Sequence, residues 1–271
     1  MPEVFGEPRL SRPVSQVCTE SQFYEPAYAY WCEQFREHPR THRKQWEFCY
    51  ILQVLSVRGK LSPEFRGLGF GVGEEPLAAL FAARGVEVTA TDLGAEQAAD
   101  AGWTCTGQHA RALDDLNRRS ICPPDEFAAR VRFETVDMHA IPTTLQDYDF
   151  TWSACALEHL GSLADGQDFI LQSLETLRPG GVAVHTTEFN VDNAGDTLDQ
   201  GSTVLFRRRD IEAVFEKAAL MGYRCSANWN PGAGRLDAYV DLPPYSEDEH
   251  LKLRIETYTT TSIGLIFDKP E

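Results

Sequence analysis

The 271-residue sequence contains no C-x-x-C pair and no apolar run of the roughly 18 residues that span a bilayer. Its 7 cysteines are odd in number and scattered, so neither a disulfide framework nor a zinc knuckle is expected. The first residues also lack an apolar core of signal-peptide length. We therefore expect reduced thiols, no membrane contact and a cytoplasmic location.

Basic residues are also scarce. Only 25 Lys and Arg stand against 41 Asp and Glu, which gives a formal net charge of −16. This charge has the wrong sign for a protein that neutralises the phosphates of a nucleic acid or of an anionic bilayer. A hydrophobic content of 42% is ordinary for a globular chain, so disordered and fibrous classes are excluded. A small-molecule substrate, or another protein, is favoured as the partner, and no nucleic-acid or membrane partner is expected.

The chain divides into an N-terminal segment and a longer α/β segment. Residues 1–60 are expected to combine an N-terminal stretch rich in Pro and Ser, which forms a flexible arm or a strap laid over the body, with a helical cap whose apolar residues recur at helical spacing. Residues 61–271 alternate short apolar runs with amphipathic stretches, which is typical of βα units. An insertion around residues 228–250 precedes the last strands and is a candidate for substrate specificity.

Strands that alternate with helices predict an α/β fold: a doubly wound, Rossmann-like, mostly parallel sheet with helices on both faces. In such a sheet, ligands bind beyond the carboxyl ends of the strands. The expected helices lie at 76–84, 163–177 and 209–221 and within 95–130. The expected strands lie at 64–70, 86–91, 131–136, 149–153 and 182–187, with one or two more at 255–267.

Three glycines at alternate positions, Gly69, Gly71 and Gly73, follow the first of these strands. A residue without a Cβ lets the backbone approach a ligand closely. Asp92 follows Gly73 by 19 residues, at the end of the next strand. A carboxylate there can accept hydrogen bonds from both hydroxyls of a ribose. The pattern predicts a cofactor that contains a nucleoside with a free 2′-hydroxyl.

Two cofactors fit a ribose site of this kind. A nicotinamide dinucleotide would place its pyrophosphate at the N-terminus of the next helix. Glu74 and Glu75 would repel it there, and Pro76 lacks an N–H. S-adenosyl-L-methionine carries a sulfonium and an ammonium group against one carboxylate, so it tolerates acidic neighbours. The charges favour S-adenosylmethionine, and an NAD-dependent oxidoreductase is the alternative.

The sequence resembles the class I S-adenosylmethionine-dependent methyltransferases, particularly those that act on small molecules and glycans. The resemblance covers about residues 60–225 and is carried by GFGVG (69–73), TDL (91–93), VDMHAIP (136–142), YDFTWSACALEHL (148–160) and LRPGGVAVHTTEFN (177–190). It implies a seven-stranded sheet that ends in an antiparallel hairpin. It also implies cofactor contacts from Gly69, Gly71, Gly73, Asp92, Leu93, Asp137, Met138, Ser153 and Ala154.

One position departs from the family pattern. The family usually has an acidic residue two positions before the first motif glycine, and this chain has Gly67 there. Glu74, Glu75 or a residue of the N-terminal helical segment is then left to meet the ammonium group of the cofactor. A non-catalytic cofactor-binding sensor or partner subunit is a further alternative for the same reason.

Methyl transfer is an in-line displacement at a sulfonium, so the enzyme must hold the acceptor atom in line with the methyl group. His159 follows the fourth strand and is the candidate base for an acceptor hydroxyl, with a local structural hydrogen bond as the alternative. His185, Glu188 and Asn190 follow the fifth strand and are expected to bind the acceptor. Glu188 and Asp192 could instead hold a divalent cation, a less favoured interpretation.

We therefore expect an O-methyltransferase that moves a methyl group from S-adenosylmethionine to a hydroxyl of a small molecule or saccharide and releases S-adenosyl-L-homocysteine. The stretch HRKQWEF (42–48) is a candidate lid over the cofactor, although Trp46 fits the core equally well. His139 is expected to be a solvated surface residue. No motif indicates the acceptor molecule or the oligomeric state.

Overall fold

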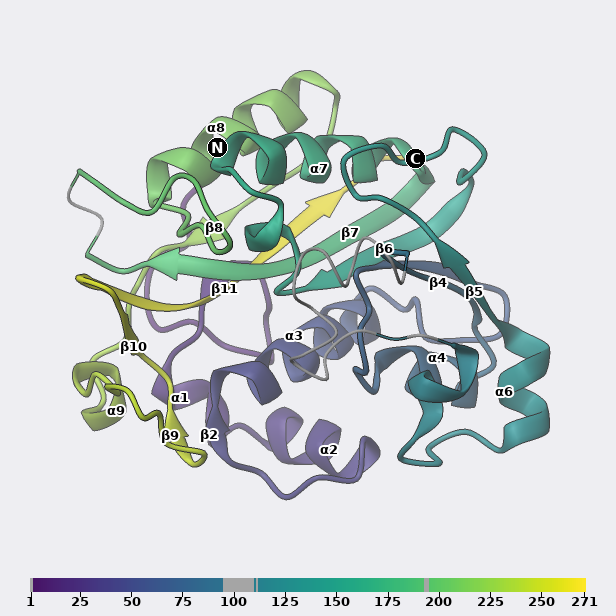
Figure 1. Cartoon of the computed structure of the whole chain (residues 1–271), viewed down its shortest axis with the longest axis horizontal. Coiled ribbons are helices and arrows are strands. Elements are labelled where there is room, and N and C mark those ends of the chain that lie inside the picture. Colours follow the sequence, from purple (N-terminus) through teal and green to yellow (C-terminus); the bar gives the residue numbers. More distant parts are fainter. Residues whose placement is uncertain (1, 95–109, 111, 193–194) are drawn as a thin grey trace.

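The computed structural model describes residues 2–94, 110, 112–192 and 195–271. Its central feature is a nine-stranded sheet (Figure 1). The helices predicted between 95 and 109 lie outside the described residues. From one edge to the other the strands are β5 (Val131–Thr135), β4 (Glu87–Asp92), β3 (Arg66–Phe70), β6 (Tyr148–Ala154), β7 (Leu177–Asn190), β11 (Tyr258–Asp268), β1 (Ser15–Val17) and β8 (Ala227–Asn228), and β10 (Leu253–Ile255) pairs with β11.

The first five strands of that order run parallel to one another, and β11 runs antiparallel to β7. This confirms the predicted doubly wound, mostly parallel α/β sheet. The number of strands differs from the prediction, because β1 and the short β8 and β10 join the five parallel strands and β11. Parallel strands are covered on both faces, and accordingly every residue of β6 is buried.

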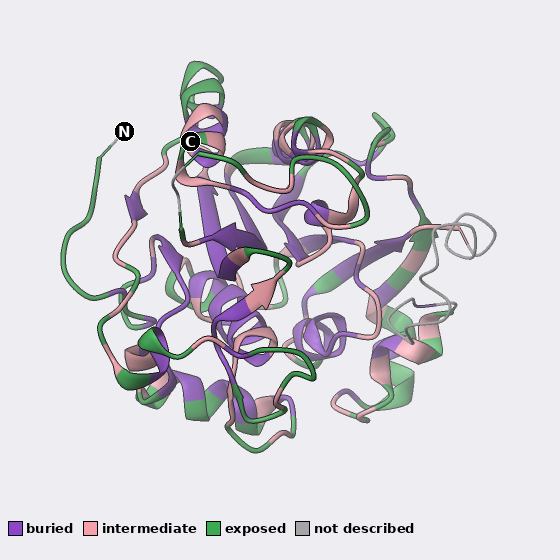
Figure 2. Ribbon diagram, turned by 60° about the vertical axis from the view of Figure 1, so that its left-hand side comes forward, coloured by how far each residue is buried: buried purple, intermediate pink, exposed green. Residues whose placement is uncertain are grey.

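Helices cover both faces of the sheet (Figure 1). Each packs through an apolar stripe, as in α7, whose buried residues include Leu163, Phe169, Ile170 and Leu174. Buried residues concentrate in the strands and the inward helix faces (Figure 2). Among the described helices, none is both long and apolar enough to cross a bilayer. One face carries α7 (Leu163–Glu175) and α8 (Arg208–Leu220), and the other α2 (Pro26–Gln34), α3 (Arg43–Val57), α4 (Leu77–Ala83) and α6 (Pro124–Arg130).

The N-terminal segment is part of the sheet. Strand β1 lies between β11 and β8, with Gln16 opposite Gly264 in the antiparallel pair and Ser15 opposite Ala227 in the parallel pair. The expected flexible arm is therefore wrong for residues 15–17, which are fully buried. The expected boundary at residue 60 therefore does not separate the N-terminal residues from the sheet, because β1 pairs with β11 and β8.

The insertion at 228–250 packs against the N-terminal cap. Its strand β9 (Glu249–His250) pairs in parallel with β2 (Thr41–His42), which directly precedes α3. The rings of His42 and His250 are stacked with centroids 4.6 Å apart. The ring Nδ1 of His250 is 2.8 Å from Oδ2 of Asp241. The insertion thereby holds the start of α3 in place.

Candidate functional site

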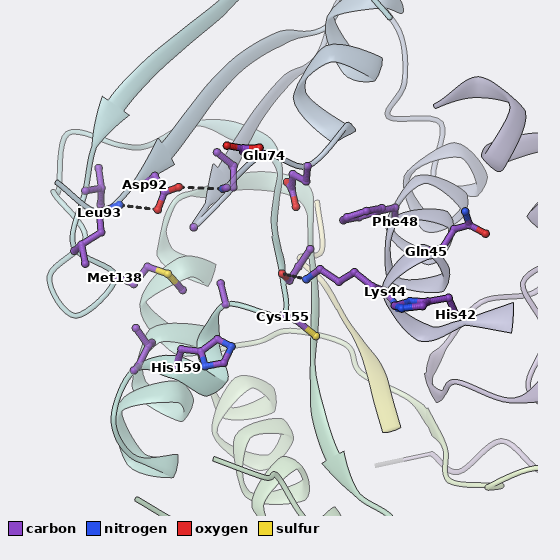
Figure 3. A pocket seen from close by; sticks show the side chains of 18 of the residues that line it. His42, Lys44, Gln45, Phe48, Glu74, Asp92, Leu93, Met138, Cys155 and His159 are labelled. Carbon is purple, nitrogen blue, oxygen red and sulfur yellow. Dashed lines mark hydrogen bonds between the residues drawn. The ribbon is translucent and has the colours of Figure 1, made fainter. Parts of the chain in front are cut away.

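A cavity of about 590 Å³ opens at the carboxyl ends of β3, β4 and β6 (Figure 3). This volume lies in the range of small-molecule sites. The start of α3 faces the strand ends across the cavity, so the walls come from segments that are far apart in the sequence. The N-terminal cap contributes Glu37, Arg40, His42, Lys44, Gln45 and Phe48.

The glycine loop forms one wall of the cavity. Gly71 and Gly73 both line it and have φ angles of 56° and 50°, in the left-handed region that favours glycine. A Cβ on Gly71 would also lie 2.8 Å from the Cβ of Ala156. The structure thus brings these two residues to the cavity and explains why they are glycines.

Gly69 has a different role from the one predicted. A Cβ there would lie 2.3 Å from Cζ2 of Trp152, its partner in the β3 to β6 register. Gly67 stands in the same relation to Phe150, with 2.4 Å between the built Cβ and Cζ. Both glycines accommodate aromatic rings of the next strand, and neither is among the cavity-lining residues. We therefore withdraw Gly69 as a cofactor contact.

Asp92 ties the glycine loop to the end of β4. Its Oδ2 accepts hydrogen bonds from the backbone N–H groups of Gly73 at 3.0 Å and Ala110 at 3.3 Å. Its Oδ1 accepts from the N–H of Leu93 at 2.8 Å (Figure 3). Asp92 and Leu93 both line the cavity, as predicted. The carboxylate is held rigidly beside Gly73.

Asp137 and Met138 also line the cavity, together with His139. Oδ1 of Asp137 accepts from the backbone N–H of His139 at 2.9 Å and is 2.8 Å from its ring Nδ1. The other ring nitrogen, Nε2, is 3.0 Å from the carbonyl oxygen of Leu160. Partial burial disfavours the charged form of both groups, but these contacts outweigh it: they raise the pKa of His139 and lower the pKa of Asp137. His139 is exposed, as expected for a solvated surface residue, and it also bridges Asp137 and Leu160 at this wall.

Ser153 and His185 were predicted at the site, but they lie on the opposite face of the sheet. His185 is fully buried, with Nδ1 2.8 Å from Oγ of Ser153 and Nε2 3.0 Å from Oγ of Ser173. Burial lowers the pKa of His185 to about 3, so its ring is neutral. Only Ala154, next in β6, reaches the cavity. Both predictions are therefore corrected: His185 links Ser153 to Ser173 of α7, and neither Ser153 nor His185 is among the cavity-lining residues.

Asn190 and Glu188 do not reach the cavity either, because β7 runs three residues beyond its expected end and pairs with β11 as far as Asn190 opposite Thr260. The side chain of Asn190 accepts from the N–H of Asp192 at 3.0 Å, and Oδ2 of Asp192 accepts from the N–H of Thr259 at 2.8 Å. These polar groups shape a loop, so their assignment to acceptor or cation binding is withdrawn.

Glu188 belongs to a buried charge network behind the cavity floor. Its carboxylate forms an ion pair with Arg43 and accepts from Oγ1 of Thr260 at 2.8 Å. Arg43 also lies 3.6 Å from Glu47, which pairs with Lys44 at 3.2 Å. Burial alone would raise the pKa of Glu47, but Lys44 and Arg43 lower it, so this carboxyl is ionised.

The same network brings ligand atoms of Cys155, Glu158 and Glu188 within 4.8 Å of one another. The guanidinium of Arg43 already provides positive charge at Glu188. Cys155 has a φ of 47°, unusual for a residue with a side chain, and burial raises the pKa of its thiol well above the ordinary value. Cys155 lines the cavity, whereas Glu158 and Glu188 are buried next to it.

His159 ends the short helix η3 (Leu157–His159) and lines the cavity. Its ring Nδ1 lies 2.7 Å from the carbonyl oxygen of Ser202. A carbonyl only accepts, so Nδ1 carries a proton and Nε2 is the basic atom of the neutral ring. Nε2 lies 4.0 Å from the buried carboxylate of Glu158. His159 is thus oriented as a general base would be.

The sequence analysis anticipated the α3 wall only as a lid over residues 42–48. Lys44, Gln45 and Phe48 share one helical face and line the cavity, whereas Trp46 is buried on the other side and donates to Oε1 of Gln22 at 3.0 Å. Nζ of Lys44 donates to the carbonyl of Ala154 at 3.0 Å (Figure 3). Within residues 42–48, helical spacing therefore places Lys44, Gln45 and Phe48 towards the cavity and Trp46 towards the core.

Residues 68–185 match a family model described as a methyltransferase domain. Among solved structures, the chain is similar to the glycopeptide N-methyltransferase MtfA (13% identity, TM-score 0.47, covering 81% of this chain and 94% of that one). It is also similar to the methyltransferase domain of bacterial-CtHen1-CN (15%, 0.48, 80% and 95%) and to a TehB-like methyltransferase from Corynebacterium glutamicum (16%, 0.41, 83% and 97%). No curated protein matches the chain.

Proposed function

We propose that the protein, whose residues 68–185 match a methyltransferase domain model, transfers the methyl group of S-adenosylmethionine to a hydroxyl of a small molecule or saccharide. The observation that carries the choice of a hydroxyl is His159, an imidazole oriented by the carbonyl of Ser202 at the cavity wall. A hydroxyl needs to lose its proton to become a good nucleophile, and this ring is placed to take it.

The cavity walls suit the three parts of S-adenosylmethionine. Asp92 would accept from the ribose hydroxyls, and Gly71 and Gly73 would lie along the methionine moiety. Asp137 would accept from the adenine amino group, with Met138 beside the ring.

In the proposed reaction, an acceptor hydroxyl lies between His159 and the α3 wall. Bound S-adenosylmethionine would supply the methyl group to the acceptor oxygen by in-line displacement, with a methyl ether and S-adenosylhomocysteine as the products. Nε2 of His159 would take the hydroxyl proton, so that the ring becomes an imidazolium. The carboxylate of Glu158, 4.0 Å from Nε2, and the carbonyl of Ser202 stabilise that positive charge.

The acceptor is proposed to be small because the cofactor and the reacting group share about 590 Å³. The net charge of −16 disfavours nucleic acid. The test is release of S-adenosylhomocysteine by the purified protein with matched panels of hydroxylated compounds, saccharides and amines. Turnover with hydroxyl acceptors supports the proposal. Turnover with amines alone, or cofactor binding without any turnover, contradicts it.

Asp92→Asn is expected to weaken binding of S-adenosylhomocysteine by about 10- to 100-fold, since a charge-assisted contact to the ribose is lost. The amide oxygen still accepts from the backbone near Gly73. 5′-Methylthioadenosine contains the same ribose and should lose affinity by the same factor. Calorimetry on both ligands checks this. Unchanged dissociation constants would contradict the ribose assignment.

A further inference from the structure

We propose that Glu75 takes the place of the acidic residue missing at position 67 and holds the ammonium group of the bound cofactor. The inference rests on the use of S-adenosylmethionine by this domain, and it concerns a residue to which the glycine motif gives no role.

Position 67 cannot supply a carboxylate in this fold. Gly67 lies opposite Phe150 in the β3 to β6 register, and a Cβ on it would be 2.4 Å from the ring. Phe150 is itself fully buried and packs edge-on against Phe81, so its ring has no room to move aside. The ring occupies the space into which an acidic side chain would extend.

Glu75 lies just after the glycine loop and is a buried carboxyl residue of the cavity wall, 7% exposed. Its backbone N–H donates to the carbonyl of Val72 at 3.3 Å, which closes a turn and fixes the start of the side chain. Its Oε1 accepts from the indole Nε1 of Trp152 at 2.6 Å. Trp152 in turn reaches this position only because Gly69 has no side chain.

The charges around Glu75 indicate that it binds a cation. The charged groups that act on it are Lys44 and Glu47 from α3 and Asp92 from β4. Lys44 is already paired with Glu47 and with the carbonyl of Ala154. Burial raises the pKa of Glu75 to about 8, although Trp152 and Lys44 oppose that effect. A ligand ammonium beside this carboxyl would favour its ionised form.

The discriminating experiment compares two ligands on Glu75→Gln. S-adenosylhomocysteine has the amino acid moiety, and 5′-methylthioadenosine lacks it. Glutamine keeps an acceptor for Trp152 but loses the charge. We expect the dissociation constant of S-adenosylhomocysteine to rise about 10- to 100-fold and that of 5′-methylthioadenosine to change by less than about twofold. Asp92→Asn is the matched control, because it should weaken both ligands alike.

Proton release gives a second readout. Below its pKa in the free protein, Glu75 must lose a proton to bind the ammonium, so affinity for S-adenosylhomocysteine should increase as the pH rises from about 6 to about 8. Glu75→Gln should remove this slope, and 5′-methylthioadenosine should not show it with the unmodified protein. Trp152→Phe removes the donor to Glu75, and it should also weaken S-adenosylhomocysteine more than 5′-methylthioadenosine.

Equal loss of both ligands, or none, in folded Glu75→Gln overturns the inference, and so does an unchanged pH slope. None of these measurements involves an acceptor. A protein that discriminates the two ligands through Glu75 but methylates no hydroxyl would contradict the proposed function alone.

Discussion

Replacing His159 by alanine is expected to lower the turnover number by about 10²- to 10⁴-fold, while the dissociation constant of S-adenosylmethionine stays within about threefold. The reason is that the Ser202 carbonyl fixes the proton on Nδ1 and leaves Nε2 as the base beside the cavity. The loss is therefore expected in the methyl-transfer step, which single-turnover measurements with a hydroxyl acceptor can isolate.

His38→Ala is the matched control, because this exposed histidine is outside the cavity lining. It should retain the turnover number of the unmodified protein. Raising the pH should partly restore the His159→Ala variant if the missing group is a base, since more acceptor is then ionised. Full activity of His159→Ala would show that His159 is a structural residue and that proton removal occurs elsewhere.

Arg43→Met is expected to reduce the free energy of unfolding by about 3 to 5 kcal/mol. The side chain of Arg43 is 15% exposed and pairs with Glu188 and Glu47, both nearly or fully buried. Methionine fills a similar volume but leaves these carboxylates with less positive charge. Urea unfolding monitored by circular dichroism measures the loss.

The pH dependence of that loss identifies its cause. Burial raises the pKa of Glu188 even with Arg43 present, and removal of Arg43 should raise it further. A carboxyl whose pKa is higher in the folded than in the unfolded state destabilises the fold as pH rises above its unfolded value. The deficit of Arg43→Met should therefore be larger at about pH 8 than at about pH 5.5.

Arg9→Met serves as the control for this second prediction. Arg9 pairs with Glu7 at 3.9 Å, and both side chains are more than half exposed. Such a pair is worth about 0 to 1 kcal/mol, so the control should unfold almost as the unmodified protein does. A loss in Arg43→Met no larger than in Arg9→Met would contradict the account of the buried network.

The sheet was largely predictable because each parallel strand is a short apolar run bounded by turn residues or acids. Strands β3, β4, β5 and β6 lie within two residues of their predicted bounds. The N-terminal strand was not predictable, since its three residues Ser15–Val17 include two polar side chains that only the sheet context buries.

The candidate site was predictable where it depends on one loop and unpredictable where it depends on pairing across the sheet. Gly71, Gly73, Asp92 and Asp137 follow strand ends, so topology alone brings them together. His185 failed as a prediction because a histidine in an apolar strand gives no sign of which face it occupies. The end of β7 is set by pairing with β11, about 70 residues later, which no local pattern reveals.

Glu75 was one of several candidates for the ammonium group, and the sequence did not single it out. Its side chain belongs to the cavity because Trp152 donates to it, and Trp152 has room because Gly69 lies opposite it in the sheet. The alternate glycines alone indicated only close approach of a ligand. Only the register between β3 and β6 shows that Gly67 and Gly69 make room for the rings of Phe150 and Trp152.

Calorimetric titration of ligand-free protein with S-adenosylmethionine, S-adenosylhomocysteine and NADH tests most directly that this cavity holds the methyl donor. The account predicts micromolar binding of the first two ligands and none of NADH, because acidic side chains line the wall that a pyrophosphate would need. Binding of NADH with no binding of the other two would contradict it and would reduce the glycine loop to a site for a different nucleotide.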